Sequence, residues 1–356
     1  MRNLLLLILL LTAASYVAYQ DAQQLLQQPL QLSQKQRFDV VQGKPFSATL
    51  NDLASQNIFA APRLVLYIRL YTRINGQAKL LKAGEYELAP GMNSLDLLAL
   101  FVSGKTVLHE LRLIEGWTFA EALSAIQSSG ELVHTLKNAD EVSIMNAIGH
   151  SGVAAEGRFF PDTYFFPKGM TDEAFLRRAS AAMDNVLKQE WEQRQDGLPY
   201  QSPEEALIMA SIVEKETGAP AERAEVAGVF VRRLQQGMKL QTDPTVIYGI
   251  GKNFDGNLRR TDLEFDTPYN TYTRLGLPPS PICLPGRASI HAALHPAEGD
   301  AIYFVSRGDG THQFSASLEQ HNAAVDKFQR KIKSRTKQQA KVKTETEEKL
   351  KRKGKH

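Results

Sequence analysis

The stretch Ser202–Gly218, with the sequence SPEEALIMASIVEKETG, contains the signals that decide the fold of the largest part of the chain. Ser202 is a favourable N-cap residue, Pro203 suits the first helical position, and Glu205 has the spacing of a capping box. Residues 206–213 are apolar or small on every face of a helix. This pattern predicts a helix that is buried in the centre of a domain.

The end of this helix has an unusual charge pattern. Gly218 is expected to cap the helix, which places Glu214 and Glu216 in the last turn, where the helix dipole disfavours each negative charge by about 0.3–1 kcal/mol. Glu216 also shares a helix face with the apolar residues 209, 212 and 213. Lost hydration on that face raises the pKa of a carboxyl group, as a general acid near neutral pH requires. The pattern alone leaves open that both glutamates are solvated at a frayed helix end.

Three segments downstream, residues 240–249, 268–272 and 276–281, are rich in Pro, Gly, Asn and Tyr. Tyrosine rings offer flat apolar faces and amide side chains offer hydrogen bonds, and both suit a sugar ligand. The same composition is typical of ordered loops that cover a core, with the prolines and glycines forming turns. The pattern alone does not decide between the two interpretations.

Length and composition bound the class of protein. The 356 residues predict two domains plus tails, and 43% hydrophobic and 23% charged residues exclude a mainly disordered chain. A single cysteine excludes a disulfide framework and a cysteine-rich metal site. Residues 326–356 contain 13 Lys/Arg and 4 Asp/Glu, so the net charge of +3 leaves a body of −6. A mildly acidic body is not typical of a nucleic-acid-binding domain.

The N-terminus contains a run of sixteen residues without a charge, Leu4–Tyr19, preceded by Arg2. The run is somewhat shorter than the ~20 residues that span a bilayer. We favour a signal-anchor within residues 1–20; a cleaved signal peptide, with a weak site at residues 13–15, is the alternative. Both predict a body outside the cytoplasm, because the positive charge precedes the apolar run.

The rest of the chain divides by pattern. Eight glutamines within residues 20–36 predict a polar linker at 21–37. A small α+β unit is expected at 38–107, a larger domain at 108–330, and a basic, disordered tail at 331–356. The expected elements of the small unit are strands at 38–41 and 84–88 and helices at 48–56, 63–72 and 94–102. Those of the larger domain include strands at 109–114 and 301–305 and helices at 118–128 and 171–194.

Several long motifs occur in the order of a known family. They are residues 210–217 and 240–249, with 156–164, 269–272 and 276–279. Up to about residue 330 the sequence resembles the YceG-like family of membrane-anchored endolytic murein transglycosylases. The resemblance implies an α+β fold with an N-terminal transmembrane anchor, a small LysM-like α+β subdomain and a mixed α/β catalytic domain with a central buried helix. Leu284 departs from the asparagine of many members, and the basic tail is no family feature.

The resemblance also implies a function. Such an enzyme is a lyase that cleaves the β-1,4 bond between N-acetylmuramic acid and N-acetylglucosamine and leaves 1,6-anhydro ends. The family's catalytic glutamate corresponds to Glu216, and our candidates for sugar binding are Gln241, Asp243, Asn270 and Tyr272. Asp243 precedes a proline and could instead cap a turn. No cofactor, no metal and no nucleic acid are expected.

The resemblance further implies a place and partners. The protein would cross the inner membrane once, with a cytoplasmic N-terminus and a periplasmic catalytic domain. Its partners would be peptidoglycan glycan strands and penicillin-binding proteins of the elongation machinery, and its cuts in nascent strands would set their length.

Two other functions remain open at this point. The first is a water-using muramidase with Glu216 as acid and Glu214 or Asp243 as second carboxylate. The second is a non-catalytic peptidoglycan-binding scaffold.

His291 and His295 are spaced for a metal, but no third ligand motif accompanies them, so we expect a helix surface.

Overall fold

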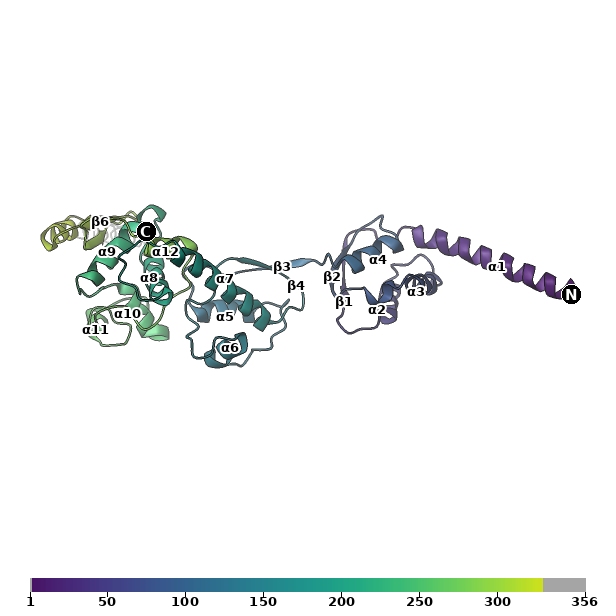
Figure 1. Ribbon diagram of the computed structural model, residues 1–356, viewed down its shortest axis with the longest axis horizontal. Helices are drawn as coiled ribbons and strands as arrows, with labels where there is room; N and C mark the ends of the chain where they lie inside the picture. The colour runs from purple at the N-terminus through teal and green to yellow at the C-terminus, as the bar shows by residue number, and fades with distance from the viewer. Residues whose placement is uncertain (1, 329–356) are drawn as a thin grey trace, which may run out of the picture. The chain divides into compact units, whose positions relative to one another are not determined.

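The computed structural model describes residues 2–328 of the chain. The predicted basic tail, residues 331–356, lies outside the described residues. The chain forms two compact units (Figure 1). Among the described residues, unit 1 consists of those up to Glu110 with Gly130–Val133 and Phe165–Met170, and unit 2 of the others up to residue 328.

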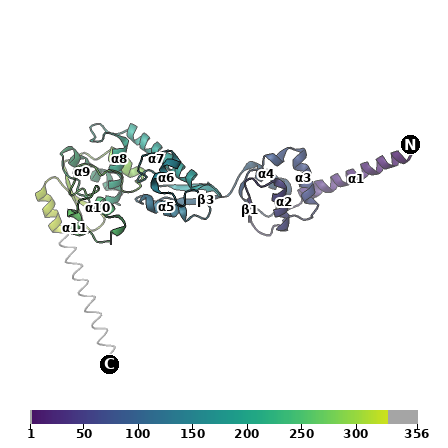
Figure 2. The ribbon, with the colours of Figure 1, turned by 90° about the horizontal axis from the view of Figure 1, so that it is seen from below.

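Unit 1 begins with α1 (Arg2–Gln27), which extends away from the other helices of this unit in both views (Figure 1, Figure 2). The helix is long and apolar enough to cross a membrane, a test that a signal sequence near the N-terminus also passes. Its leucines at positions 4–7 are each more than half exposed. Apolar side chains of this size favour a hydrocarbon environment over water.

The core of unit 1 lies between a two-stranded sheet and a set of helices. β1 (Gln36–Val40) pairs antiparallel with β2 (Gly84–Leu88), which places Phe38 opposite Tyr86. Both rings pack against Phe101, with ring centroids 6.2 and 4.8 Å away. The helices of this unit are α2 (Phe46–Ser55), α3 (Leu64–Ile74), η1 (Gln77–Lys79) and α4 (Ser94–Ser103). The helices and strands expected at 38–102 therefore agree with the structure to within two residues.

The glutamine-rich stretch differs from its prediction as a polar linker. α1 continues to Gln27, and Leu25, Leu26 and Leu30 are buried in the core of unit 1. The backbone N–H of Leu30 also donates a hydrogen bond to the carbonyl of Met92 at 2.7 Å. The polar composition predicted a linker because it does not show that these three leucines are buried by the rest of the unit. This stretch is part of the folded unit.

Unit 2 is built around α8 (Pro203–Glu216), whose residues 206–213 are all buried. It contacts α7 (Asp172–Glu192), α9 (Arg223–Gln235), α10 (Asp243–Ile250) and α12 (Arg287–Leu294) (Figure 1). Burial on all sides matches the absence of a polar face in its sequence. The other elements of unit 2 include α5 (Phe119–Gln127), α6 (Glu141–Ile148), η2 (Pro220–Glu222), η3 (Gly251–Asn253), α11 (Arg260–Glu264), β5 (Tyr303–Ser306) and β6 (His312–Ser315). The chain also contains two strands that belong to neither unit alone, β3 (Leu108–Arg112) and β4 (Thr163–Pro167), which pair in a two-stranded sheet.

The two ends of α8 follow the predictions only in part. Ser202 caps the helix by accepting a hydrogen bond from the N–H of Glu205. The Glu205 carboxylate accepts from the N–H of Gln201 at 2.6 Å, so the reciprocal bond of a capping box is not formed to the cap residue. Gly218 is not the C-cap, because the chain already leaves the helix at Thr217 in an extended conformation. Glu216 is therefore the last helical residue.

Candidate active site

A cavity of about 300 Å³, called the cleft below, surrounds the C-terminal end of α8 in unit 2. It contains Glu216 and three of the four predicted sugar-binding residues. Its lining consists of Glu216, Arg233, Leu240, Gln241, Asp243, Tyr272, Phe304, Val305, Ser306, His312, His321 and Val325. Side chains from α8, α9, α10, the loop after α11 and the β5–β6 hairpin thus line one cleft.

Glu216 is partly buried at the end of α8, and its carboxylate accepts a hydrogen bond of 2.5 Å from the hydroxyl of Thr242. Loss of hydration raises the pKa of Glu216, and the negative charge of Asp243 raises it further. The Thr242 hydrogen bond and the positive charge of Arg233 act against this shift without cancelling it. The raised pKa favours the protonated form that a general acid needs.

Asp243 and Tyr272 lie side by side in the cleft. The Tyr272 hydroxyl donates a hydrogen bond of 2.6 Å to Oδ1 of Asp243, and burial is the largest cause that raises the pKa of Tyr272. Asp243 is the first residue of α10, and the N-cap position is taken by Thr242, whose side chain makes no capping bond. The hydrogen bond between Tyr272 and Asp243 already orients both side chains. They can therefore contact a ligand at little cost in conformational entropy.

Gln241 adopts a left-handed backbone conformation with φ of 51°. This conformation is uncommon for a residue other than glycine and costs about 1 kcal/mol or more. The N–H of Gln241 donates to the carbonyl of Thr271 at 3.1 Å, which fixes the strained residue in place. Its exposed side chain lines the cleft next to Asp243. Strain of this kind is concentrated at functional sites.

Asn270 has a different position from the other three candidates. It is fully buried and does not line the cleft. Its amide nitrogen donates to the carbonyls of Leu263 and Phe265 at 3.0 and 2.7 Å, and its amide oxygen accepts from the N–H of Tyr272 at 2.8 Å. Through these bonds the Asn270 side chain holds the loop that carries Tyr272. Its amide was expected to face a sugar because the sequence pattern does not show the direction of a side chain in a loop.

Arg233 was not among the predicted residues, although it lines the cleft. It is 7% exposed, and its guanidinium donates to the carbonyls of Ile302 and Leu240, both at 2.7 Å. Burial lowers the pKa of Arg233. The side chain connects α9 to the residue before β5 and to the strained loop before Asp243, and its positive charge acts on Glu216. A basic residue near the end of a helix gives no signal of this role in the sequence.

The sequence analysis also missed His312. It lines the cleft from β6, and its Nδ1 lies 2.8 Å from Oε2 of Glu222. The only signal in the sequence is a histidine that directly follows the turn residues 308–311 and begins a short strand. His321, from the helical residues 318–328, lines the same cleft.

Two further glutamates, Glu214 and Glu156, lie outside the cleft. Glu214 was a candidate for the second carboxylate, and Glu156 is notable because it is buried. Glu214 does not line the cleft; its carboxylate accepts from the N–H of Gly286 at 3.0 Å. Glu156 is 6% exposed and accepts from the N–H of Phe119 and the hydroxyl of Tyr248, at 2.9 and 3.1 Å. Burial raises the pKa of Glu156 to about 7. It too lies outside the lining of the cleft.

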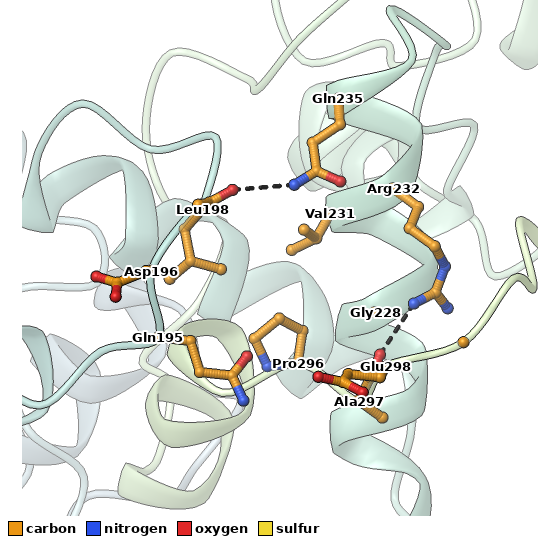
Figure 3. A pocket seen from close by; sticks show the side chains of 12 residues that line it. Gln195, Asp196, Leu198, Gly228, Val231, Arg232, Gln235, Pro296, Ala297 and Glu298 are labelled. Carbon is orange, nitrogen blue, oxygen red and sulfur yellow. Dashed lines mark hydrogen bonds between the residues drawn. The ribbon is translucent and has the colours of Figure 1, made fainter.

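A second cavity, of about 320 Å³, lies between α9 and the segments 195–198 and 296–299 (Figure 3). Two of its polar side chains are bonded to the backbone: Arg232 donates to the carbonyl of Ala297 at 2.9 Å and Gln235 to that of Gly197 at 3.0 Å. A Cβ atom at Gly228 would lie 2.5 Å from the carbonyl oxygen of Ala297. The close approach of the two backbones explains the glycine and indicates a structural junction.

The two histidines of α12 have a third neighbour, contrary to the sequence analysis. Ligand atoms of Glu190, His291 and His295 lie within 4.8 Å of one another. Arg287 donates to Oε1 of Glu190 at 2.9 Å, and Nδ1 of His291 lies 2.8 Å from Oε2. Both nitrogens of His295 face backbone carbonyls. The carboxylate is thus already engaged by a fixed positive charge, and we assign no metal to this group.

Comparisons with known proteins identify a family. The model of the YceG-like family matches residues 38–327. The chain is 30% identical over 307 residues to the endolytic murein transglycosylase of Bacillus subtilis (strain 168), an alignment that covers 82% of this chain and 84% of that protein. It is also 30% identical over 286 residues to the endolytic murein transglycosylase of Streptococcus pneumoniae serotype 2, covering 69% of this chain and 50% of that protein. The chain therefore spans about half the length of the pneumococcal relative.

Among solved structures, the chain is similar to the crystal structure of a yceG-like protein from Listeria monocytogenes. The identity is 31%, the alignment covers 82% of this chain and 99% of the other, and the TM-score is 0.49. The match of the family model and the relative from Bacillus subtilis together extend over most of both chains. On this basis the chain belongs to the YceG-like family.

Proposed function

We propose that this protein is a lytic transglycosylase, a lyase that cleaves the β-1,4 bond between N-acetylmuramic acid and N-acetylglucosamine in peptidoglycan and leaves 1,6-anhydro-muramyl ends. The observation that carries the proposal is Glu216, a partly buried carboxyl group with a raised pKa in a cleft of polar side chains. The names of the curated relatives support the same reaction class.

Glu216 gives up one proton and regains one in this proposal. The protonated carboxyl group donates to the leaving glycosidic oxygen as the bond to the anomeric carbon breaks. The C6 hydroxyl of the same muramyl sugar then attacks that carbon, assisted by the sugar's own acetamido group, and the hydroxyl proton ends on the Glu216 carboxylate. Because the nucleophile belongs to the substrate, the step gains the high effective molarity of an intramolecular reaction. A second catalytic carboxylate is not required.

Gln241, Asp243 and Tyr272 are the residues that we propose to contact the sugars. All three line the cleft together with Glu216. Tyr272 offers a ring face and a hydroxyl, and Asp243 offers the carboxylate oxygen that Tyr272 leaves free. Asn270 acts indirectly, because its bonds to the backbone hold the loop that carries Tyr272.

The N-terminal part is proposed to keep the enzyme at the membrane. α1 would cross the inner membrane once, with the N-terminus in the cytoplasm and the catalytic unit in the periplasm, since Arg2 precedes the apolar run. The small α+β fold of residues 38–107 is proposed to be LysM-like and to bind glycan. The antiparallel pair of β1 and β2, covered by short helices, supports this proposal.

The biological role follows as part of the same proposal. Endolytic cleavage next to the membrane would act on nascent strands and set their length. Penicillin-binding proteins of the elongation machinery are the proposed partners, because they deliver those strands at the same surface.

A hydrolytic muramidase is the second candidate, and one observation favours it. The Asp243 carboxylate lines the same cleft as Glu216 and raises the pKa of Glu216 through its charge. It could activate a water in a two-carboxylate mechanism. Glu214, the other candidate for this role, is bonded to Gly286 outside the cleft. A non-catalytic scaffold is the remaining alternative.

The mass of the product separates these functions. Full-length protein in detergent is incubated with purified peptidoglycan, and the released fragments are analysed by mass spectrometry. The full chain is used because Leu25 and Leu26 belong to the core of unit 1. Internal fragments with anhydro-muramyl ends support the lytic transglycosylase. Reducing ends that are heavier by one water identify a muramidase, and intact glycan points to the scaffold.

A further inference from the structure

His312 lines the cleft and is left unused by the mechanism above, as is its carboxylate partner Glu222. The Glu222 carboxylate, on η2, accepts hydrogen bonds from the backbone N–H of His312 at 3.0 and 3.1 Å. The Nδ1 atom of the His312 ring lies 2.8 Å from the same carboxylate. The side chains of His312 and Glu222 are only 12% and 15% exposed. A carboxylate that engages both the backbone and the ring of one residue fixes that ring in a single orientation.

The pairing also decides which ring nitrogen is available. A carboxylate only accepts hydrogen bonds, so Nδ1 carries the hydrogen, and the neutral ring keeps a lone pair on Nε2. Phe304 and Phe314 flank the ring, with centroids 5.3 and 6.3 Å away, and limit its rotation. Since His312 lines the cleft while Nδ1 is engaged by Glu222, Nε2 is the nitrogen left for a ligand in the cleft.

His312 is also close enough to Glu216 to affect it. The two side chains line the same cavity of about 300 Å³, and the charge of a protonated His312 would lower the pKa of Glu216. His321, the other histidine of the cleft, has an Nδ1 atom that is buried without a hydrogen-bond partner among residues 2–328. Only His312 therefore has the carboxylate partner that activates a histidine as a base.

We propose that His312, held by Glu222, takes the proton of the muramyl C6 hydroxyl and passes it to the Glu216 carboxylate. This inference rests on the proposed lytic transglycosylase reaction and adds the route of its second proton. As the C6 oxygen forms its bond to the anomeric carbon, the O–H bond breaks and the proton moves to Nε2. The bond to the leaving oxygen breaks at the same centre, and that oxygen receives the proton of Glu216. The imidazolium then returns one proton to the Glu216 carboxylate, so the enzyme neither gains nor loses protons.

His312 is thus a catalytic residue in this proposal, and Glu222 is a positioning residue that acts through it. The relay explains how Glu216 is reprotonated although its carboxylate faces the leaving group. The paired Glu222 carboxylate stabilises the positive imidazolium during the transfer. The sequence places the two residues 90 positions apart, so only the fold brings them together.

The test uses full-length protein on purified peptidoglycan and measures kcat, KM, the product mass and the melting temperature. For His312→Ala we expect kcat to fall by about 10²–10⁴-fold, with KM nearly unchanged. Added imidazole should restore part of the lost kcat in this variant, because it can enter the vacated space and accept the proton. His312→Gln, which keeps a polar side chain of similar size, should lose kcat as well. Glu222→Gln should lower kcat in the same direction, while His291→Ala on the surface of α12 serves as the matched control.

Each result has a defined meaning. A loss of kcat with an unchanged melting temperature and rescue by imidazole supports the relay. If His312→Ala and His312→Gln both keep the parent kcat within about twofold, the relay is rejected, although anhydro products from the parent still support the proposed function. A loss that imidazole restores in neither variant also rejects it. Absence of cleavage by the parent itself rejects the proposed function and this inference together.

Discussion

The hydroxyl of Thr242 donates a hydrogen bond of 2.5 Å to the carboxylate of Glu216. This bond stabilises the ionised form of Glu216, whereas burial and the charge of Asp243 stabilise the protonated form. The balance sets the pH above which the protein loses its proposed general acid. Two substitutions change this balance in opposite directions and test the assignment.

Thr242→Val should move the alkaline limb of activity to higher pH. The substitution removes the hydrogen bond that stabilises the carboxylate, so the pKa of Glu216 rises further. Since the protonated form is the acid, activity then persists to higher pH. The dependence of kcat/KM on pH measures the limb directly. A limb that moves to lower pH would contradict the role of this bond.

Asp243→Asn should move the same limb to lower pH. The substitution removes a neighbouring negative charge that raises the pKa of Glu216. Glu216 then loses its proton at a lower pH, whatever the change in maximal rate. Glu264→Gln, an exposed glutamate paired with Arg260 on α11, is the control and should leave the limb in place. An alkaline limb at the same pH in the parent and in Asp243→Asn would show that the two carboxylates do not interact.

Glu156 should make stability depend on pH. Burial raises the pKa of Glu156 from 4.5 to about 7. A raised pKa in the folded state gives stability that is fully present below the unfolded pKa and is lost as pH rises through about 7. The loss is on the order of 3 kcal/mol when the group is fully ionised.

Glu156→Gln removes this titration. Relative to the parent, its free energy of unfolding should therefore be higher at alkaline pH than at acidic pH. Denaturant unfolding at about pH 5 and about pH 8 measures the difference. A constant difference between the two proteins at both pH values would show that Glu156 does not titrate in this range.

Leu26→Ala should destabilise unit 1 although the residue lies in a glutamine-rich stretch. Leu26 is 3% exposed in the core of this unit, and truncation of a buried leucine costs about 2–5 kcal/mol. Gln24→Ala, at an exposed position two residues earlier, is the matched control. Thermal unfolding in detergent compares the two variants. Equal melting temperatures would mean that the stretch is a free linker, as its composition predicts.

The sequence predicted the features that depend on local pattern. The apolar residues 206–213 indicated a buried helix. The helix face made Glu216 a candidate acid but left open that it is solvated, and the family resemblance favoured the catalytic role. The strands and helices that could be recognised by alternation or periodicity agree with the structure. Such signals depend only on residues close together in the sequence, so they predict local structure without knowledge of the fold.

Features that depend on long-range contacts could not be predicted in this way. His312 and Arg233 reach the cleft from segments far from Glu216 in the sequence. Asn270 belongs to a motif rich in sugar-binding residue types, yet its side chain faces the backbone of its own loop. The leucines of the glutamine-rich stretch are buried only because the rest of unit 1 supplies the surface that covers them. Composition describes none of these contacts.

The central claim, that Glu216 is the acid of a lytic transglycosylase, has one direct test. Full-length protein, its Glu216→Gln variant and the matched control Glu214→Gln, on the same helix but outside the cleft, are incubated with purified peptidoglycan. Mass spectrometry of the products should show internal anhydro-muramyl fragments from the parent and from Glu214→Gln, and none from Glu216→Gln. Anhydro products from Glu216→Gln at the parent rate would contradict the claim.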